Sequence, residues 1–142
     1  MLLLRRIIDM VRKALAIAAG MLGLAAAAQA ASPPPAVPNC GTFVVRPASI
    51  TIACGDGNYF LRSLRWSKWG GPTAEAIGTA VVNTCTPYCA AGKFRSYPAG
   101  VTLDRLATCG KRRFYSRLIV AFTKTIPAGL KRRDVIATNC KP

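Results

Sequence analysis

The 142-residue sequence contains no histidine, and only five acidic residues stand against twenty Lys and Arg. Without histidine, a Ser-His-Asp or Cys-His catalytic arrangement cannot form, and small basic nucleases that rely on histidine are excluded as well. A glycosidase needs two carboxylates about 5 to 10 Å apart, whereas the acidic residues here are spread along the chain. We therefore predict that the protein is not an enzyme. A small hydrolase that uses Asp56 or Asp104 is the enzymatic alternative.

The sequence also lacks an apolar run of the roughly 20 residues that a membrane-spanning helix needs. The N-terminal apolar run, residues 14–28, follows four basic residues and leads into Ala28-Gln29-Ala30, a pattern that signal peptidase accepts. Residues 1–30 are therefore predicted to be a secretory signal peptide, with an N-terminal membrane anchor as the alternative. Met10 is an alternative start, because the segment from Met10 onward is itself a typical signal peptide. We expect a secreted or extracytoplasmic protein with no transmembrane segment in its mature chain.

The six cysteines include no Cys-x-x-Cys pair, which together with the absence of histidine argues against a zinc site or a thioredoxin-like redox motif. We predict neither a metal nor a cofactor. An even number of cysteines behind a signal peptide indicates a disulfide framework instead. Six cysteines allow 15 connectivities, and the sequence alone does not choose among them. Local geometry favours the pairs Cys40–Cys54, Cys85–Cys89 and Cys109–Cys140.

The proline-rich residues 31–39 predict an extended linker, so that a single β domain spans residues 40–142. No later segment shows helical periodicity, and β-branched runs between turn residues indicate six to eight short strands. The first two, residues 42–46 and 49–53, are expected to pair as a hairpin that brings Cys40 close to Cys54. The other candidate strands are residues 59–71, 74–85, 94–109, 112–124 and 134–140. The predicted fold is a small disulfide-stapled antiparallel β-sandwich, with an immunoglobulin-like topology as one option, preceded by the signal-peptide helix.

Two local features bear on this fold. Residues 55–58, Gly-Asp-Gly-Asn, directly follow Cys54 and are residue types that accept positive φ in tight turns. A calcium loop needs carboxylates at alternate positions, and Asp56 stands alone, so we predict a disulfide-anchored turn, with a functional loop as the alternative. In the strand 59–71, the charges fit neither face cleanly, which indicates a bulge or bend. Without a bulge, Trp66 and Trp69 would point to opposite faces of the strand.

Basic residues give the mature chain its most distinctive property. From Ala31 onward, sixteen Lys and Arg stand against four acidic residues, a net charge of +12. A field of this sign favours an anionic envelope polymer, an anionic lipid surface or nucleic acid. If residues 112–124 form a strand, Arg113, Tyr115 and Arg117 make an outward stripe, in which an aromatic ring lies between two guanidinium groups. The second candidate cluster is Lys131, Arg132 and Arg133. The alternative is that these charges only protect sheet edges.

Four strings stand out as possible family markers: ITIACGDGN (50–58), WSKWG (66–70), CTPYCAAGKFRSYP (85–98) and RRFYSRLIV (112–120). They resemble an uncharacterised family of small secreted cysteine-containing actinobacterial proteins, over roughly residues 40–124. The resemblance implies export and the cysteine framework, and it supplies no catalytic residues. We therefore expect a domain that binds an anionic ligand at or outside the cell envelope. The alternative is a secreted inhibitor or effector that presents the disulfide-rigidified loop 85–98 to a protein partner.

Overall fold

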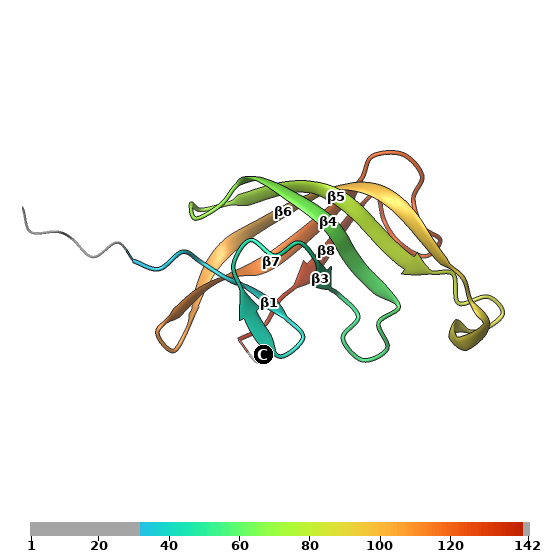
Figure 1. Cartoon of the computed structure of the whole chain (residues 1–142), viewed down its shortest axis with the longest axis horizontal. Coiled ribbons are helices and arrows are strands. Elements are labelled where there is room, and N and C mark those ends of the chain that lie inside the picture. Colours follow the sequence, from blue (N-terminus) through green and yellow to red (C-terminus); the bar gives the residue numbers. More distant parts are fainter. Residues whose placement is uncertain (1–31, 141–142) are drawn as a thin grey trace, which may run out of the picture. The chain divides into compact units, whose positions relative to one another are not determined.

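The computed structural model describes residues 32–140, so the predicted signal peptide and its helix lie outside the described residues. The described part is nearly all β, in two antiparallel sheets (Figure 1). The small sheet pairs β1 (Val37–Asn39) with β2 (Thr42–Val44). The large sheet joins six strands in chain order, and a short 3-10 helix, η1 (Cys89–Ala91), lies between its third and fourth strands. Its strands are β3 (Ile50–Thr51), β4 (Tyr59–Lys68), β5 (Ala74–Asn83), β6 (Phe94–Cys109), β7 (Arg112–Phe122) and β8 (Arg133–Ala137).

The predicted fold class is confirmed: two antiparallel sheets are stapled by disulfides. The three bonds join Cys40 to Cys54, Cys85 to Cys89 and Cys109 to Cys140, as local geometry favoured. The large sheet is a meander in which every strand pairs with its neighbours in the chain. An immunoglobulin-like domain instead uses Greek-key connections, so that option does not describe this topology.

The predicted hairpin between residues 42–46 and 49–53 is wrong. β2 pairs with β1, in the register Val37 with Val44, and β3 pairs with β4. The loop between β1 and β2 is Cys40-Gly41, and both residues have positive φ, 40° and 95°. Two consecutive residues of this kind match the right-handed twist of a two-residue hairpin. The turn therefore belongs inside the Asn-Cys-Gly-Thr sequence, ahead of the position where the β-branched pattern placed it.

Part of the predicted linker 31–39 belongs to the folded unit, which begins at Pro33. Pro35, Ala36 and Val37 are fully buried. The backbone of Ala36 runs beside β7: its N–H donates to the Arg113 carbonyl at 3.0 Å, and its carbonyl accepts from the Tyr115 N–H at 3.0 Å. Proline lacks the donor that a central strand needs, but it is tolerated at an edge. This proline-rich segment is therefore structural.

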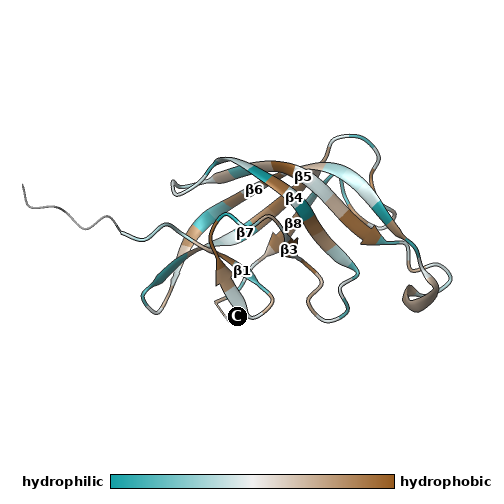
Figure 2. Ribbon diagram, in the orientation of Figure 1, coloured by the Kyte–Doolittle hydropathy of each residue, from teal (hydrophilic) through white to brown (hydrophobic). Residues whose placement is uncertain are grey.

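One face of the large sheet, here called the inner face, carries the core. The strands carry both apolar and hydrophilic residues (Figure 2), and along the middle of β6 the buried residues Ala99, Val101 and Leu103 alternate with more exposed ones, as a strand with one buried face requires. The branched core residues come mainly from β4, β6 and β7, whereas β5 contributes small alanines. The opposite, outer face carries exposed polar side chains and some exposed apolar ones, among them Ile77 and Phe94. The buried inner-face residues of the large sheet include Ile50, Leu61, Ala76, Ala80, Ala99, Val101, Leu103, Leu118, Val120 and Phe122.

The bulge expected in β4 is present. The register shifts between Arg62 and Arg65, and Ser63 between them has a φ of 54°. Arg62 pairs with Thr79 and Arg65 with Ile77. Because Thr79 and Ile77 lie two residues apart on β5, the two arginines share the outer face although they are three residues apart in sequence.

The irregular end of β4 also changes the expected positions of the two tryptophans. Trp66 and Trp69 are both half-buried and pack edge to face, with ring centroids 4.5 Å apart. Trp66 donates its indole N–H to the Pro47 carbonyl at 2.7 Å, and Trp69 donates to the Pro35 carbonyl at 3.0 Å. The tryptophans therefore act as packing residues: Trp69 holds the N-terminal segment, and Trp66 holds the connection between β2 and β3.

Candidate anion-binding groove

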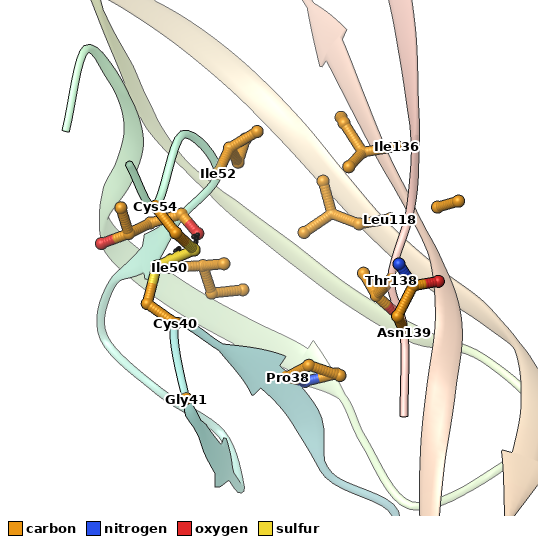
Figure 3. A pocket seen from close by; sticks show the side chains of 12 residues that line it. Pro38, Cys40, Gly41, Ile50, Ile52, Cys54, Leu118, Ile136, Thr138 and Asn139 are labelled. Atoms are coloured by element: carbon orange, nitrogen blue, oxygen red, sulfur yellow. Dashed lines mark hydrogen bonds between the residues drawn. A yellow bond between two sulfur atoms is a disulfide. The ribbon is translucent and has the colours of Figure 1, made fainter. Parts of the chain in front are cut away.

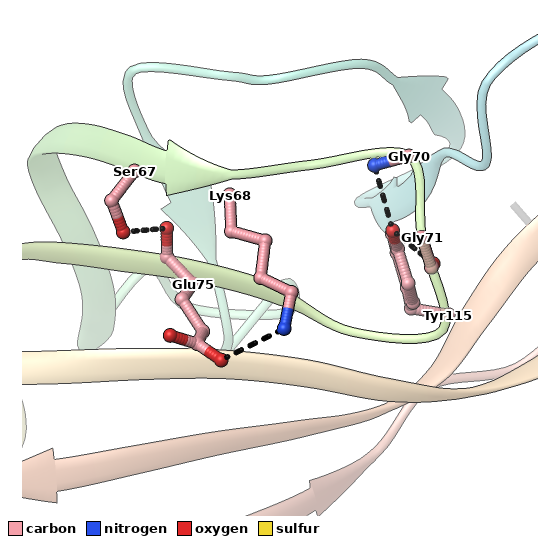
Figure 4. A network of polar contacts seen from close by, with 6 residues as sticks. All are labelled: Ser67, Lys68, Gly70, Gly71, Glu75 and Tyr115. Carbon is pink, nitrogen blue, oxygen red and sulfur yellow. Dashed lines mark hydrogen bonds and ion pairs between the residues drawn. The ribbon is translucent and has the colours of Figure 1, made fainter.

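The predicted outward stripe is wrong at its centre, because Tyr115 is fully buried. Its ring packs edge to face against Trp69, with centroids 5.5 Å apart. Its hydroxyl accepts from the Gly70 N–H at 3.2 Å and donates to the Gly71 carbonyl at 3.1 Å (Figure 4). Tyr115 therefore fixes the turn after β4 and is not available to a ligand.

The reason is a local break in the side-chain alternation of β6 and β7. Arg105 has a φ of 55°, and Arg105 and Ser116 are missing from the otherwise continuous ladder. Ser116 Oγ instead donates to the Arg105 carbonyl at 2.7 Å. Directly before this break in β7, the consecutive residues Phe114 and Tyr115 are both buried. The alternation that would have exposed Tyr115 holds only for a regular strand.

Arg117, the other end of the stripe, is held by an ion pair. Its Nε donates to Oδ1 of Asp104 at 2.6 Å, and Nη2 donates to the second carboxylate oxygen. This hydrogen-bonded pair lowers the pKa of Asp104 and raises the pKa of Arg117. Of the predicted stripe, only Arg113 remains exposed and free of a described ion pair.

The second predicted cluster, Lys131 to Arg133, is exposed but lies far from Arg113. Arg133 pairs with Ala121 near the end of β7, whereas Arg113 lies at its start. Eight residues of strand separate the two positions, which is roughly 27 Å at the usual rise. Arg132 also donates to the Phe122 carbonyl at 3.0 Å, so it supports the chain after β7. The six predicted ligand-binding residues therefore do not form one site.

Two cavities adjoin at Pro98 and offer a better site, which we call the outer groove. The first, about 300 Å³, lies over the middle of the outer face, and its lining includes Arg65, Thr79, Gly100 and Thr123. The second, about 500 Å³, continues from Pro98 along the start of β6, and its lining includes Phe94, Arg95, Ser96 and Lys124.

Positive charge dominates the outer groove. Arg65, Arg95 and Lys124 line it, with Arg95 on the side of β6 that also carries Tyr97. Arg62 lies beside it, donating to Ser96 Oγ at 3.2 Å. No carboxylate lines either cavity. We define these four basic residues, Arg62, Arg65, Arg95 and Lys124, as the groove cations.

Three of the four described carboxylates are engaged by other partners. Glu75 pairs with Lys68 at 3.5 Å (Figure 4), and Asp104 pairs with Arg117. Asp56 accepts from the backbone and side chain of Asn58, and these hydrogen bonds lower its pKa. The groove cations therefore have no described ion-pair partner within residues 32–140, and their charge is available to an anionic ligand.

The floor and rim of the groove suit an extended ligand. Gly100 leaves the floor open, since a Cβ atom there would meet nothing within 4 Å. Thr79, Ser96 and Thr123 add hydroxyl groups, and Phe94 is 55% exposed at the rim. Guanidinium groups bind phosphate or carboxylate oxygens in pairs, and an exposed ring offers a stacking surface for a base or a sugar.

The sequence-based prediction missed these four cations. The one available signal was the irregular charge pattern of residues 59–71, which correctly indicated a bulge. The bulge places Arg62 and Arg65 on one face, whereas a regular strand would place residues three apart on opposite faces. Arg95 and Lys124 lie near each other only because β6 pairs with β7 along the large sheet, with Ala99 opposite Phe122. That proximity depends on register, which a single strand pattern does not contain.

Residues 85–98 form the loop that the alternative prediction, a secreted inhibitor or effector, assigns to a protein partner. This loop is held in place by hydrogen bonds and a disulfide. Asn83, which lies just before this loop, has a polar side chain that is buried and only 8% exposed. Its amide donates to Asn58 Oδ1 and to the Cys89 carbonyl, both at 2.8 Å, and its carbonyl oxygen accepts from the Cys85 N–H at 3.0 Å. The Cys85–Cys89 disulfide closes the loop, and Tyr88 on it is 64% exposed.

Comparisons of the chain with protein-family models, with curated proteins and with solved structures give no match. Within residues 32–140, no group of three or more candidate ligand residues is placed to hold a metal ion. In the same part of the chain, no helix has the length and apolar character needed to cross a membrane.

Proposed function

We propose that this protein is an exported basic β-domain that binds an extended anionic ligand in the outer groove, at or outside the cell envelope. The observation that carries the proposal is the gathering of four basic side chains around two adjoining cavities that no carboxylate lines. Charge-assisted hydrogen bonds from arginine are among the stronger ones that a surface can make. A polymer with repeated anionic groups is favoured because the two cavities adjoin and carry cations along both.

Export is supported by the order of features in residues 1–30 and by three disulfides, which persist in oxidising compartments. We expect the full chain, expressed in a secreting host, to be recovered from outside the cytoplasm as a protein that begins at Ala31. Intact-mass measurement with and without reductant checks both points, because three disulfides remove six hydrogens. A product that retains residues 1–30 would support a membrane anchor instead.

The function is tested by retention of the purified oxidised protein on three baits: nucleic acid, purified envelope fractions and anionic vesicles, each at low and moderate salt. We expect one bait to retain the protein at low salt and to lose it as salt rises, because neutralising a polyanion releases counterions. Arg62→Ala/Arg65→Ala is expected to weaken binding to that bait at least tenfold and to flatten its salt dependence.

The matched control is Arg112→Ala/Arg113→Ala, which removes the same charge from exposed residues at the other end of β7. It is expected to weaken binding by less than threefold. Equal losses in the two variants would show that net charge alone drives retention. No retention on any bait at low salt would rule out the anionic ligand.

A protein partner is the second candidate, favoured by the exposed rings of Tyr88 and Phe94 on and beside the disulfide-closed loop. Binding through this loop would depend on Tyr88 and would change little with salt, because apolar contact is not screened. A Tyr88→Ala variant separates the two candidates: it is expected to leave retention on the anionic bait unchanged.

A further inference from the structure

A separate cavity of about 510 Å³ lies at the seam between the two ends of the large sheet, where β3 and β8 come near each other without pairing (Figure 3). Ile50 and Ile52 line it from the β3 side, and Leu118 and Ile136 line it from β7 and β8. The Cys40–Cys54 disulfide forms part of the wall on the β3 side. We call this space the seam cavity.

The chemistry of the seam cavity differs from that of the outer groove. Four branched aliphatic side chains make its apolar walls, and Thr51, Thr138 and Asn139 supply uncharged polar groups. No charged side chain lines it, whereas three cations line the outer groove. An ionised group placed among these residues would be partly desolvated without a partner, which is costly.

We propose that the seam cavity binds a small, uncharged molecule that combines an apolar part with a polar group. Its volume falls within the roughly 300 to 1,000 Å³ of small-molecule sites, which are mostly apolar with a few polar groups that orient the ligand. The site shares no lining residue with the outer groove, so this inference is independent of the proposed anionic ligand.

The test uses N-phenyl-1-naphthylamine, an uncharged apolar fluorophore, with the purified oxidised protein. We expect saturable fluorescence with one site per chain, and displacement by 1-decanol at a concentration at least tenfold lower than by decanoate at pH 8. Ile136→Trp fills the cavity from β8 and is expected to weaken probe binding at least tenfold. Val135→Trp is the matched control: Val135 is 57% exposed, adjacent in sequence and on the opposite face, so binding should be unchanged.

Non-saturable fluorescence, or equal loss in the Ile136→Trp and Val135→Trp variants, would overturn the proposal. If Ile136→Trp alters the circular dichroism spectrum, Ile52→Phe fills the cavity from the opposite wall and is expected to give the same loss. Decanoate that competes as well as decanol would contradict an uncharged ligand.

Discussion

Replacing Cys109 and Cys140 together by serine is expected to lower the free energy of unfolding by about 4 kcal/mol, the largest loss among the three disulfides. The bond closes a loop with a sequence separation of 31, compared with 14 for Cys40–Cys54 and 4 for Cys85–Cys89. In the chain-entropy model, the stabilisation grows with the logarithm of the loop length. The same model gives about 3 kcal/mol for the Cys40–Cys54 loop and about 2 kcal/mol for the shortest loop.

The position of the Cys109–Cys140 disulfide gives a second reason to expect a large loss of stability. β8 is an edge strand that pairs only with β7, over five residues, and its side chains alternate between exposed and half-buried. The disulfide joins the end of β6 to the chain just after β8. Without it, we expect β8 to detach before the rest of the large sheet. Because Ile136 lies on β8, fluorophore binding at the seam cavity should weaken in this variant even where the protein remains folded.

Urea denaturation of three paired Cys→Ser variants measures the order of the three losses, with the Cys85→Ser/Cys89→Ser variant as the control for loss of a disulfide as such. A larger loss for that control than for the Cys109–Cys140 variant would show that loop length does not govern these bonds. Amide hydrogen exchange checks the local expectation. In the Cys109–Cys140 variant, the amides of β8 should lose protection before those of β4 and β5.

The strand pattern and cysteine spacing predicted most of the fold, because both depend on local sequence. The long strands β4 to β7 were found from β-branched and aromatic runs. The Cys40–Cys54 pair was also predicted correctly, although the reason was wrong: the expected hairpin does not exist. Cys40 lies in the turn between β1 and β2, and the two Cα atoms come within 5.4 Å because β3 ends near that turn. Several courses of the backbone can bring two cysteines 14 residues apart into bonding distance. A correctly predicted disulfide therefore does not establish which strands pair between its cysteines.

The candidate site was less predictable, because it depends on contacts between distant parts of the chain. Tyr115 was expected to be exposed, since nothing in residues 112–124 reveals that Arg105, on the neighbouring strand, breaks the alternation. Arg62 and Ser96 are 34 residues apart, yet they are joined by a hydrogen bond on the outer face. A basic residue can be counted from sequence, but its neighbours follow from register and bulges. For this reason the composition could predict an anionic ligand, whereas the six residues predicted to bind it lie in separate parts of the structure.

A second large effect is expected at Gly92, where substitution by alanine should cost about 2 to 3 kcal/mol of stability. A Cβ atom there would come closer than 3.0 Å to Asn83 Oδ1 and would lie 2.7 Å from the Cys85 backbone N. Forcing Asn83 aside breaks its three hydrogen bonds and leaves buried polar groups unsatisfied, which costs about 1 to 3 kcal/mol. Gly100→Ala is the control, since its Cβ would meet nothing within 4 Å; its effect should stay within about 0.5 kcal/mol.

The backbone of Gly92 makes this result easy to interpret. Its φ of −69° and ψ of 165° lie in the extended region that any residue adopts. At such a position, alanine by itself stabilises by about 0.4 to 1 kcal/mol, by restricting the unfolded chain. A net loss must therefore come from the contact with Asn83 and Cys85, and urea denaturation of the single variants measures it.

A double-mutant cycle with Asn83→Ala then separates the two contacts. Asn83→Ala alone is expected to cost about 2 kcal/mol, because Cys85 N–H and the Cys89 carbonyl lose their partner. In that background, Gly92→Ala should cost less than about 1 kcal/mol, since the displaced side chain is already gone; groups in one network are not additive. The cycle also bears on function. If Asn83 holds the 85–89 loop in place, both single variants should free Tyr88 to move, and the heteronuclear NOE of its amide should fall. Additive losses would instead assign the cost to the Cys85 backbone, and the loop would then owe its position to the disulfide alone.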